Sequence, residues 1–435
     1  DTCQDVLMQF TDFLLSSGSI NNGKSVESLV DVMPSMSYLL GDVGLAIPIA
    51  FQLVRPLVRA ALHYGENPNS APPNLQQWHP FSQDMKNVVC QYLPADVWCA
   101  ISPELYLTFW SLSVYDVFLP KLKYEAEIKR LKEKYSELDK SGGQNEDRVA
   151  NKQRRNDMTK ILNLTNTLKE EQDNQRKHIE LIKTMIINHK DSYLSHVTSE
   201  WSPKTTENIM QYCLYARVIM SPSDATFCSR FFMLLHSLET PGFSTIHFID
   251  KTMKTLAPLI FCSTEYEAGF LGFYIHDLLE ISNRWIVSKT AYNKEARSKC
   301  GMEKTFGAKG LEGRATHEDY INVCKIWHKK LSSILCSCLK STEYMHVRAA
   351  LVFLTKVAQE FPTRTSGGKV LLSCVESIDK DDNDKEDLKI MAKSLSAILK
   401  KRSSTWLDDE VKEKKRPITQ TTTSNNNGNN NNNNN

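Results

Sequence analysis

Two heptad-patterned segments, separated by a short polar break, lie between residues 121 and 196 and constrain the fold more than any other feature. Their apolar residues recur at alternating steps of three and four, which is the repeat of a helix that winds along a partner. The stripe of the first segment consists of Tyr124, Ile128, Leu131, Tyr135 and Leu138. The stripe of the second consists of Met158, Ile161, Thr165, Leu168, Gln172, Gln175, Ile179, Ile182, Ile186, His189 and Tyr193.

The break, Ser141-Gly142-Gly143-Gln144-Asn145, is rich in turn residues and predicts an antiparallel helical hairpin. Charged side chains make up 31 of the 80 residues from 121 to 200 (17 basic and 14 acidic), against 24% of the whole chain. A hairpin this polar cannot bury both flanks against a globular core, so we expect it to protrude. The sequence leaves open whether it is a solvated charged arm or a protein-docking arm.

If the arm docks a protein, the apolar stripe is where the partner binds. Gln172 and Gln175 within the stripe would weaken an isolated helix pair while helping to fix its register. The candidate partner-docking residues are Ile179, Ile182 and Ile186.

The sequence on both sides of the hairpin predicts helices, because no stretch shows the period-two alternation of a strand. Helix caps occur at Ser202, Ser221, Thr264 and Thr316, and the last three are followed three residues later by an acid. The helices expected after the hairpin span about 203–219, 223–238, 264–291, 317–340, 343–360 and 384–401. Short connections between them favour an all-α, α-solenoid-like fold of HEAT/ARM-type helical pairs, with the hairpin protruding.

Residues 1–63 predict short helices, whose apolar faces carry Val6, Phe10, Phe13 and Leu14, and then Val26, Leu29 and Val30. A further helix over 47–62 has Phe51, Val54, Val58 and Leu62 on one stripe. Pro56 lies inside this helix and should kink or divide it, because proline removes a helix hydrogen bond. Residues 65–80 are rich in proline and asparagine and predict a loop, and the basic, then asparagine-rich residues beyond Arg402 predict disorder.

Composition limits the classes of function. The net charge of +2 gives no reason to expect nucleic acid or an acidic membrane as a partner, and no run of 18 apolar residues predicts a membrane span. The eleven cysteines are dispersed along apolar helix faces, which favours free thiols in a reducing compartment. The chain starts at Asp1 without a basic-then-apolar leader, so we expect a piece of a longer protein.

The strongest candidates for a metal site are Cys324, His328, Cys336 and Cys338. On a continuous helix Cys336 and Cys338 point about 200° apart, so both cannot turn toward a metal held by the first pair. The glycine loops 307–310 and 366–369 lack the GxxxxGK(S/T) spacing that wraps a phosphate. No cysteine lies in a recognisable nucleophile turn. We therefore expect no catalytic residue, no cofactor, no metal and no small-molecule substrate.

The segment from Trp98 to Pro120 contains SPELYLTFWSLSVYD and leads directly into the charged arm. It resembles the SP-x-x-Y-x-TFWSL-x-x-YD element of the family of THO complex subunit 2. Further elements match in order: Ala50-Phe51 with Arg55-Pro56, Ser223 to Phe231 with His236, Thr240 to Thr245, Thr264 to Ala268, Arg284-Trp285, and Tyr320 with Trp327-His328-Lys329. Three positions depart from the family pattern, where Ala216 replaces a proline, Gly242 an asparagine and Ile286 a histidine.

The resemblance covers about residues 10–400 and implies a non-enzymatic nuclear scaffold that couples transcription elongation to mRNP assembly and nuclear mRNA export. It implies other THO subunits and a DEAD-box RNA helicase as partners, with mRNA contacted indirectly or through the basic tail, and no membrane. The resulting division is a helical-repeat domain at 1–120 (the back half of a helicase-docking scaffold), a coiled-coil hairpin at 121–200, a C-terminal helical domain at 201–400 and a disordered tail at 401–435.

Two other interpretations are open. The first is a helical scaffold of another RNA-processing or translation-initiation machine, which the FWSL and TPGFST elements speak against. The second is a helical hydrolase, for which no pair of nucleophile and base is visible.

Overall fold

A computed structural model describes residues 33–141, 148–194, 202–305, 310–379 and 385–408, together with Val6, Gln9 and Val30. The described residues form helices, and their β-type contacts are limited to two isolated bridges, Glu303 with Arg314 and Arg364 with Leu407. The all-α prediction is confirmed. No helix in the described part of the chain is long and apolar enough to cross a membrane.

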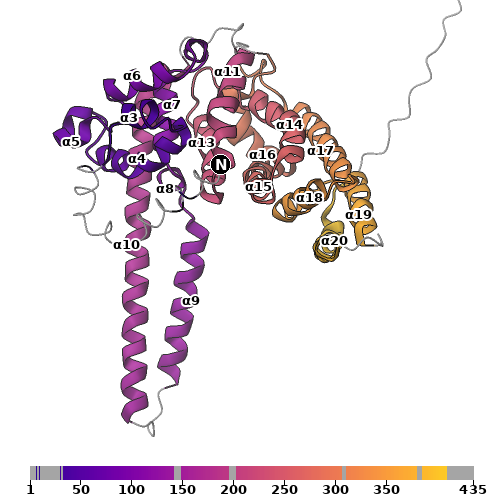
Figure 1. Cartoon of the computed structure of the whole chain (residues 1–435). Helices are drawn as coiled ribbons and strands as arrows, with labels where there is room; N and C mark the ends of the chain where they lie inside the picture. Colours follow the sequence, from indigo (N-terminus) through magenta and orange to yellow (C-terminus); the bar gives the residue numbers. More distant parts are fainter. Residues whose placement is uncertain are drawn as a thin grey trace, which may run out of the picture.

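The helices before residue 120 form an N-terminal block, coloured indigo to purple in Figure 1. They are α3 (Met36–Gly41), α4 (Ile47–Leu62), α5 (Pro73–Gln76), α6 (Gln83–Tyr92), α7 (Pro103–Ser111) and α8 (Val114–Val117). Helix α7 is the centre of this block, since every side chain from Leu105 to Ser111 is buried. It packs against α4, where the ring of Trp110 stacks on that of Phe51 with centroids 6.0 Å apart.

Helix α4 passes through Pro56 without interruption, so the prediction that this proline divides the helix is wrong. Val54, Leu57 and Val58 around it are fully buried, and each contributes about 1.5–3 kcal/mol through burial. This packing outweighs the roughly 3 kcal/mol that an internal proline costs. The expected loop at 65–80 contains the short helix α5. Of the apolar faces expected upstream, only Val6 and Val30 lie within the described residues.

The predicted hairpin is present as α9 (Lys121–Lys140) and α10 (Arg148–Tyr193), which lie side by side and project from the body (Figure 1). All the residues of the two predicted stripes are buried or half-buried. The turn residues after Ser141 lie outside the described residues. The inner end of α10 is embedded in the body, because Ile182, Met185, Ile186 and Tyr193 belong to the hydrophobic core.

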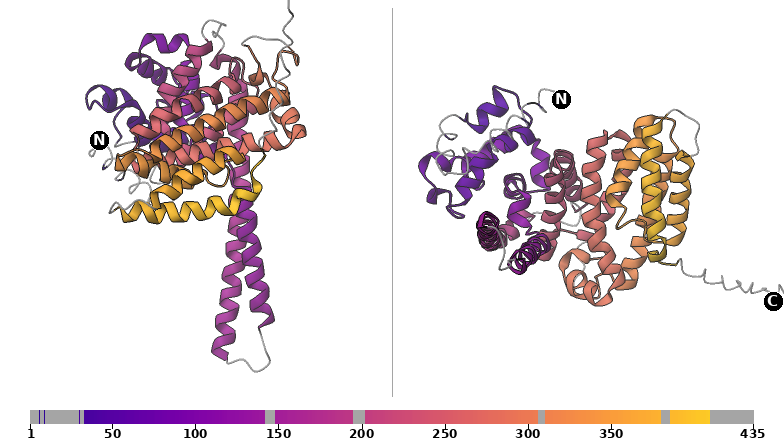
Figure 2. Two further views of the ribbon diagram at one scale, coloured as in Figure 1. Left: turned by 90° about the vertical axis from the view of Figure 1, so that its right-hand side faces the viewer. Right: turned by 90° about the horizontal axis from the view of Figure 1, so that it is seen from below.

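A C-terminal block of stacked helices follows the hairpin, coloured rose to yellow in Figure 1. Its α-helices are α11 (Ser202–Asn208), α12 (Tyr215–Val218), α13 (Pro222–Ser237), α14 (Thr245–Cys262), α15 (Glu265–Val287), α16 (Lys289–Tyr292), α17 (His317–Leu339), α18 (Tyr344–Val357), α19 (Thr365–Asp379) and α20 (Glu386–Arg402). Helix α13 packs on α15, α15 on α18, α14 on α17, α17 on α19 and α19 on α20. This side-by-side stacking confirms the solenoid-like architecture (Figure 2).

One continuous hydrophobic core connects the two blocks and the inner end of α10. The view along the arm in Figure 2 (right) shows α9 and α10 end-on between the N-terminal and C-terminal blocks. The domain boundaries expected at residues 120 and 200 stay a prediction. The structure places the arm at the junction of the blocks.

Candidate functional site

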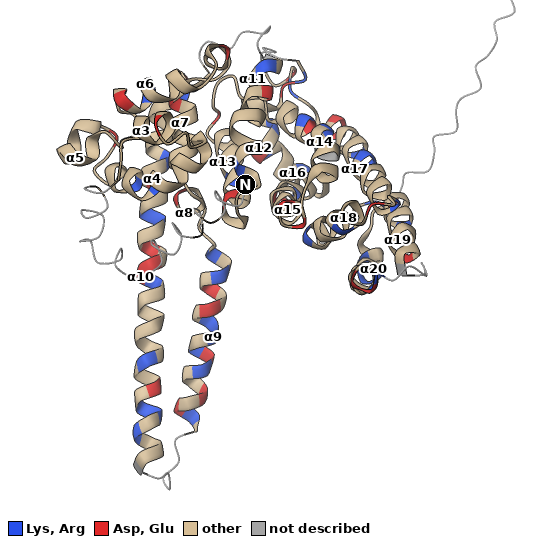
Figure 3. Cartoon of the chain, in the orientation of Figure 1, with Lys and Arg blue, Asp and Glu red and all other residues tan. Residues whose placement is uncertain are grey.

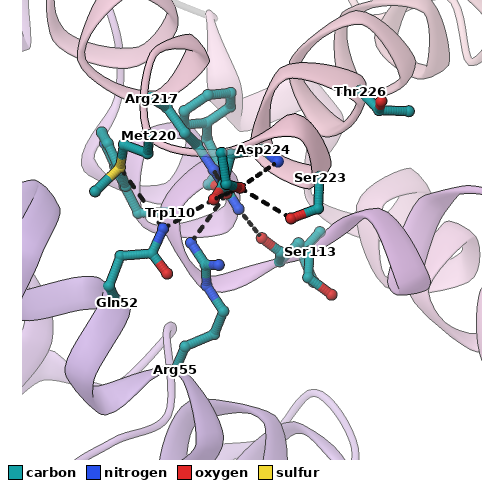
Figure 4. A network of polar contacts seen from close by, with 12 residues as sticks. Gln52, Arg55, Trp110, Ser113, Arg217, Met220, Ser223, Asp224 and Thr226 are labelled. Atoms are coloured by element: carbon teal, nitrogen blue, oxygen red, sulfur yellow. Dashed lines mark hydrogen bonds and ion pairs between the residues drawn. The ribbon is translucent and has the colours of Figure 1, made fainter. Parts of the chain in front are cut away.

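The N-terminal and C-terminal blocks meet at a buried network centred on Asp224 (Figure 4). Ser221 caps α13 by accepting a hydrogen bond from the Asp224 N–H at 3.0 Å, and its hydroxyl donates to Oδ2 of Asp224 at 2.7 Å. Oδ1 of Asp224 accepts from Nε of Arg217 at 2.7 Å and from the Arg55 guanidinium at 3.3 Å. The Gln52 amide donates to Oδ2 at 3.0 Å. Helix α4 is thereby joined to the start of α13.

Arg217 extends this network to α7. Its side chain has no solvent exposure, and its guanidinium donates to the carbonyl oxygens of Phe109 and Leu112. These carbonyls lie at the C-terminus of α7, where oxygens lack helical partners and a cation is favoured by the helix dipole. The guanidinium also lies 3.8 Å from the ring centroid of Phe227. One arginine therefore satisfies a helix end and neutralises a buried carboxylate.

Asp224 and Arg55 stay ionised at neutral pH. Burial alone would raise the pKa of Asp224, but Arg217 and Arg55 outweigh it and lower that pKa to about 2. Burial and the neighbouring Arg217 lower the pKa of Arg55 to about 10. Breaking such a pair leaves an uncompensated buried charge, which is costly. We therefore assign the network a structural role, which is to hold the two blocks in one orientation.

The root of the arm is fixed by a second buried carboxylate, Asp116 of α8. Its Oδ2 accepts from the Ser113 N–H at 2.6 Å and from the Ser113 hydroxyl at 2.8 Å, which forms a capping box. Its Oδ1 lies 2.7 Å from Nε2 of His178 on α10 and 4.0 Å from Nε of Arg59 on α4. Burial would raise the pKa of Asp116, but His178 and Arg59 lower it below its usual range.

Gln175, one turn away from His178, joins three segments at the same root. Its Nε2 donates to the carbonyl oxygens of Tyr115 at 3.3 Å and Phe118 at 3.1 Å. The Tyr124 hydroxyl of α9 donates to its Oε1 at 3.5 Å. The side chain is only 4% exposed, so these partners replace water. Because a shift of α10 by one turn would break all three contacts, Gln175 sets the register of the arm.

Ile179, Ile182 and Ile186 lie on one face of α10, as the heptad pattern predicts, and are 6%, 2% and 0% exposed. Ile182 and Ile186 are part of the core that the chain forms by itself. Partner binding at these three residues stays a prediction. A partner would contact these buried side chains only if α10 moved away from the body. The accessible surface of the arm is therefore its outer part.

The outer part of the arm exposes apolar residues beside its closed seam. Leu162 and Leu164 flank the buried Ile161 and are 47% and 48% exposed. The rest of its surface alternates in charge (Figure 3), with exposed ion pairs such as Lys129 with Glu133. Such pairs contribute about 0.3–0.5 kcal/mol each and are screened by salt. The arm therefore exposes one leucine on each side of its buried seam, among charged residues.

Two short π-helical stretches in the C-terminal block each supply a carbonyl to an aromatic or imidazole side chain. The first, Ile209–Leu214, lies between α11 and α12, and Trp110 Nε1 donates to its Tyr212 carbonyl at 3.3 Å. The second, Asn293–Arg297, follows α16, and its Glu295 carbonyl lies 3.0 Å from Nε2 of His236. A widened π-turn leaves carbonyls free for such contacts.

His236 is the centre of a further buried cluster. Its Nδ1 lies 2.7 Å from the Thr245 hydroxyl, and its ring lies 5.6 Å from that of Trp285. Burial lowers its pKa to about 4, so it is neutral at physiological pH. Both hydrogen bonds fit a neutral ring whose Nε2 carries the proton, and His236 serves packing rather than proton transfer.

The four residues weighed as a metal site point in different directions. Sγ of Cys324 lies 3.6 Å from the Ser282 hydroxyl, while Nδ1 of His328 contacts the Thr363 hydroxyl. Among the described residues no group of three or more His, Cys, Asp or Glu side chains is placed to hold a metal. Ten of the eleven cysteines fall within the described part of the chain, and all ten are free thiols.

Sequence reasoning did not single out Arg217 and Asp224 as a pair. Both lie in or beside elements that carry the family resemblance, as do Arg55, Phe109 and Phe227. The signal in the sequence is therefore the family resemblance itself, because the elements that carry it meet at one buried junction.

Comparisons with known proteins agree with these elements. A family model described as transcription factor/nuclear export subunit protein 2 matches residues 98–399. THO complex subunit 2 of Homo sapiens is 30% identical over 421 residues, which cover 93% of this chain and 26% of that protein. The Arabidopsis thaliana protein of the same name is 28% identical over 94% of this chain and 23% of its own length. The Saccharomyces cerevisiae protein of that name is 24% identical over 69% of this chain. The chain thus spans about a quarter of the length of the plant and human relatives.

Proposed function

This chain belongs to the THO complex subunit 2 family, and we propose on that basis that it acts as a non-enzymatic scaffold segment of a nuclear THO complex. In this role it holds other THO subunits and supports transcription elongation, mRNP assembly and nuclear mRNA export. A DEAD-box RNA helicase docks on the N-terminal block, and mRNA is contacted indirectly or through the basic tail. The division into the N-terminal block, the arm, the C-terminal block and the tail is part of the same proposal.

The proposal rests on the exposure of the outer part of the arm. It projects beyond both blocks in Figure 1, and α9 packs mainly on α10. Long helices outside a core gain little stability by themselves, since most helical stability comes from packing an apolar face. Leu162 and Leu164 lie on opposite sides of the seam, so helices of another subunit that pack on the two sides of the arm would bury one leucine each. Full burial of a leucine side chain contributes about 1.5–3 kcal/mol.

The test is a comparison of two double variants in a pull-down from nuclear extract, with mass spectrometry of the proteins retained. Leu162→Glu with Leu164→Glu changes the arm. The matched control, Ile326→Glu with Ile390→Glu, changes two exposed isoleucines of the C-terminal block, which are 66% and 65% exposed. Both variants introduce the same charge at exposed helical positions, so both are expected to keep the wild-type melting temperature.

The expected result is that the arm variant loses a coiled-coil subunit of the complex while the control retains it. Retention of every partner by the arm variant would mean that the arm is a solvated charged hairpin. Absence of THO subunits from the wild-type pull-down would contradict the scaffold proposal itself.

The helicase proposal needs its own measurement. Purified DEAD-box helicase is expected to bind the wild-type chain and the arm variant equally, because its site is assigned to the N-terminal block. Equal helicase binding by a hairpin-only fragment would contradict that assignment.

A further inference from the structure

A groove of about 760 Å³ runs between α17 and the start of α19 in the C-terminal block. One wall is a face of α17 that includes Lys329, Ser333 and Lys340, and the other includes Arg364, Gly367 and Val370. Gly367 allows the close approach of the two walls, because a Cβ there would lie 3.0 Å from the Ser332 hydroxyl oxygen. The groove is therefore a feature that this packing of α19 creates.

The charges that line the groove all have one sign. Lys325, Lys329, Lys340 and Arg364 are cationic, and no carboxylate lines the groove. Within the described part of the chain, Lys329, Lys340 and Arg364 form no ion pair. Arg364 is half-buried and lines the groove. The first turn of α19 adds positive potential, since the N-terminus of a helix favours anions.

His328 supplies an independent observation. It lines the groove, is only 5% exposed and has its Nδ1 engaged with the Thr363 hydroxyl. Its Nε2 is buried and, among the described residues, has no hydrogen-bond partner. Leaving such a buried group unsatisfied costs about 1–3 kcal/mol. When the Thr363 hydroxyl donates to Nδ1, Nε2 carries the proton and is a donor that lacks an acceptor among the described residues.

The length of the groove indicates the size of the ligand. Lys325 and Lys340 are four turns apart on α17, which corresponds to roughly 22 Å at 1.5 Å per residue. A single small anion would occupy one end of this span. An extended peptide of about six or seven residues would reach both ends at about 3.3 Å per residue.

We propose that this groove binds an extended acidic peptide of a partner protein. Its carboxylates pair with Lys329, Lys340 and Arg364, an acceptor oxygen receives the Nε2–H of His328, and an apolar side chain lies against Val370, which is 55% exposed. The proposal concerns a different surface from the arm and does not depend on the function proposed above.

The side chains of the groove favour a peptide over single-stranded nucleic acid. Recognition of single strands combines a basic channel with exposed aromatic rings on which bases stack. The aromatic side chains lining this groove are Phe361, which is fully buried, and His328, which packs edge-on against it with centroids 5.9 Å apart. No ring is thus available for base stacking, while carboxylates need only the cations and donors that are present.

The proposal is tested by fluorescence anisotropy with the full chain and a labelled peptide of aspartate and glutamate around one leucine. A control peptide has asparagine and glutamine at the acidic positions. Lys329→Glu with Lys340→Glu reverses two exposed charges in the groove. The matched control, Lys330→Glu with Lys401→Glu, makes the same change in net charge at two exposed lysines outside it. A melting curve of each variant checks that it is folded.

The acidic peptide is expected to bind the wild-type chain and the control variant with similar affinity. The groove variant is expected to bind it at least about tenfold more weakly, which corresponds to about 1.4 kcal/mol. Failure of the peptide to bind the wild type, or equal weakening in both variants, would overturn the proposal. So would tighter binding of an oligouridine that displaces the peptide and shows the same dependence on Lys329 and Lys340, because the occupant would then be RNA.

Discussion

Nε of Arg217 lies 2.7 Å from Oδ1 of Asp224, across the turn that separates α12 from α13. The two residues are seven positions apart in the sequence, and both are buried. The same arginine binds the end of α7, and the same aspartate binds α4. This ion pair therefore joins the start of the C-terminal block to both α4 and α7 of the N-terminal block.

Arg217→Met is expected to destabilise the chain by about 3–5 kcal/mol, because it leaves Asp224 with a weaker partner and two α7 carbonyls without a donor. Arg55→Met serves as the comparison. Its side chain is 15% exposed and makes only the longer contact with Asp224, so a smaller loss is expected. Urea denaturation of both variants measures the difference. Equal losses would show that Arg217 has no special role at the junction.

Gln175→Leu is expected to cost about 1–3 kcal/mol, because the carbonyl oxygens of Tyr115 and Phe118 lose their donor. The natural control is Gln172→Leu, three residues earlier on the same stripe, where the side chain is half-buried. That change is expected to shift stability by no more than about 0.5 kcal/mol. Thermal melting of the two variants compares them directly. A larger loss for Gln172→Leu would contradict the role of Gln175 in setting the register.

The triple change of Ile179, Ile182 and Ile186 to Asp is expected to unfold much of the body, because it buries carboxylates in the core. Far-UV circular dichroism and melting measure this loss. The Leu162→Glu with Leu164→Glu variant, changed only on exposed positions, is expected to keep the wild-type spectrum. A triple variant that stays folded and loses one partner would instead support direct docking at these isoleucines.

Acid is expected to destabilise the chain partly through His236. The pKa of this residue is about 4 in the folded chain because it is buried, against about 6.5 in the unfolded chain. The unfolded state therefore binds the proton more tightly, and stability falls as pH drops from about 6.5 to about 4, by at most about 3 kcal/mol. His236→Gln keeps a donor for the Glu295 carbonyl and cannot titrate. Denaturation across this range is expected to show a flatter pH dependence for the variant, and an unchanged slope would contradict the assignment.

The heptad pattern predicted both helices of the arm, since a long periodic stripe is a strong signal. Helices α14 and α19 were not predicted. Helix α14 follows Ser244, which makes no side-chain cap bond, and contains Pro258, so it lacks the usual start signal and includes a helix breaker. Helix α19 begins with Thr-Ser-Gly-Gly, residues that disfavour a helix. In both, tertiary packing overrides weak local propensity.

Periodicity also cannot say what covers an apolar stripe. Ile161 and Ile182 occupy equivalent heptad positions, yet the first lies in the outer arm and the second in the core of the body. The pair of Arg217 and Asp224 was equally beyond a local pattern, because its partners come from α4 and α7, more than a hundred residues away. A single sequence shows the stripe, and only the fold shows its neighbours.

Helix α10 is 46 residues long, or about 69 Å, and within the described part of the chain its contacts with the body lie at its inner end. In mechanical terms it is a cantilever. From the root at Gln175 to Arg148 its free length is roughly 40 Å, so a tilt of about 5° at the root would move the tip by about 3.5 Å. The contacts of Gln175 and His178 therefore determine the direction in which the arm points and the position of its tip. A small repacking at the junction of the blocks would therefore displace the tip of the arm by several ångströms.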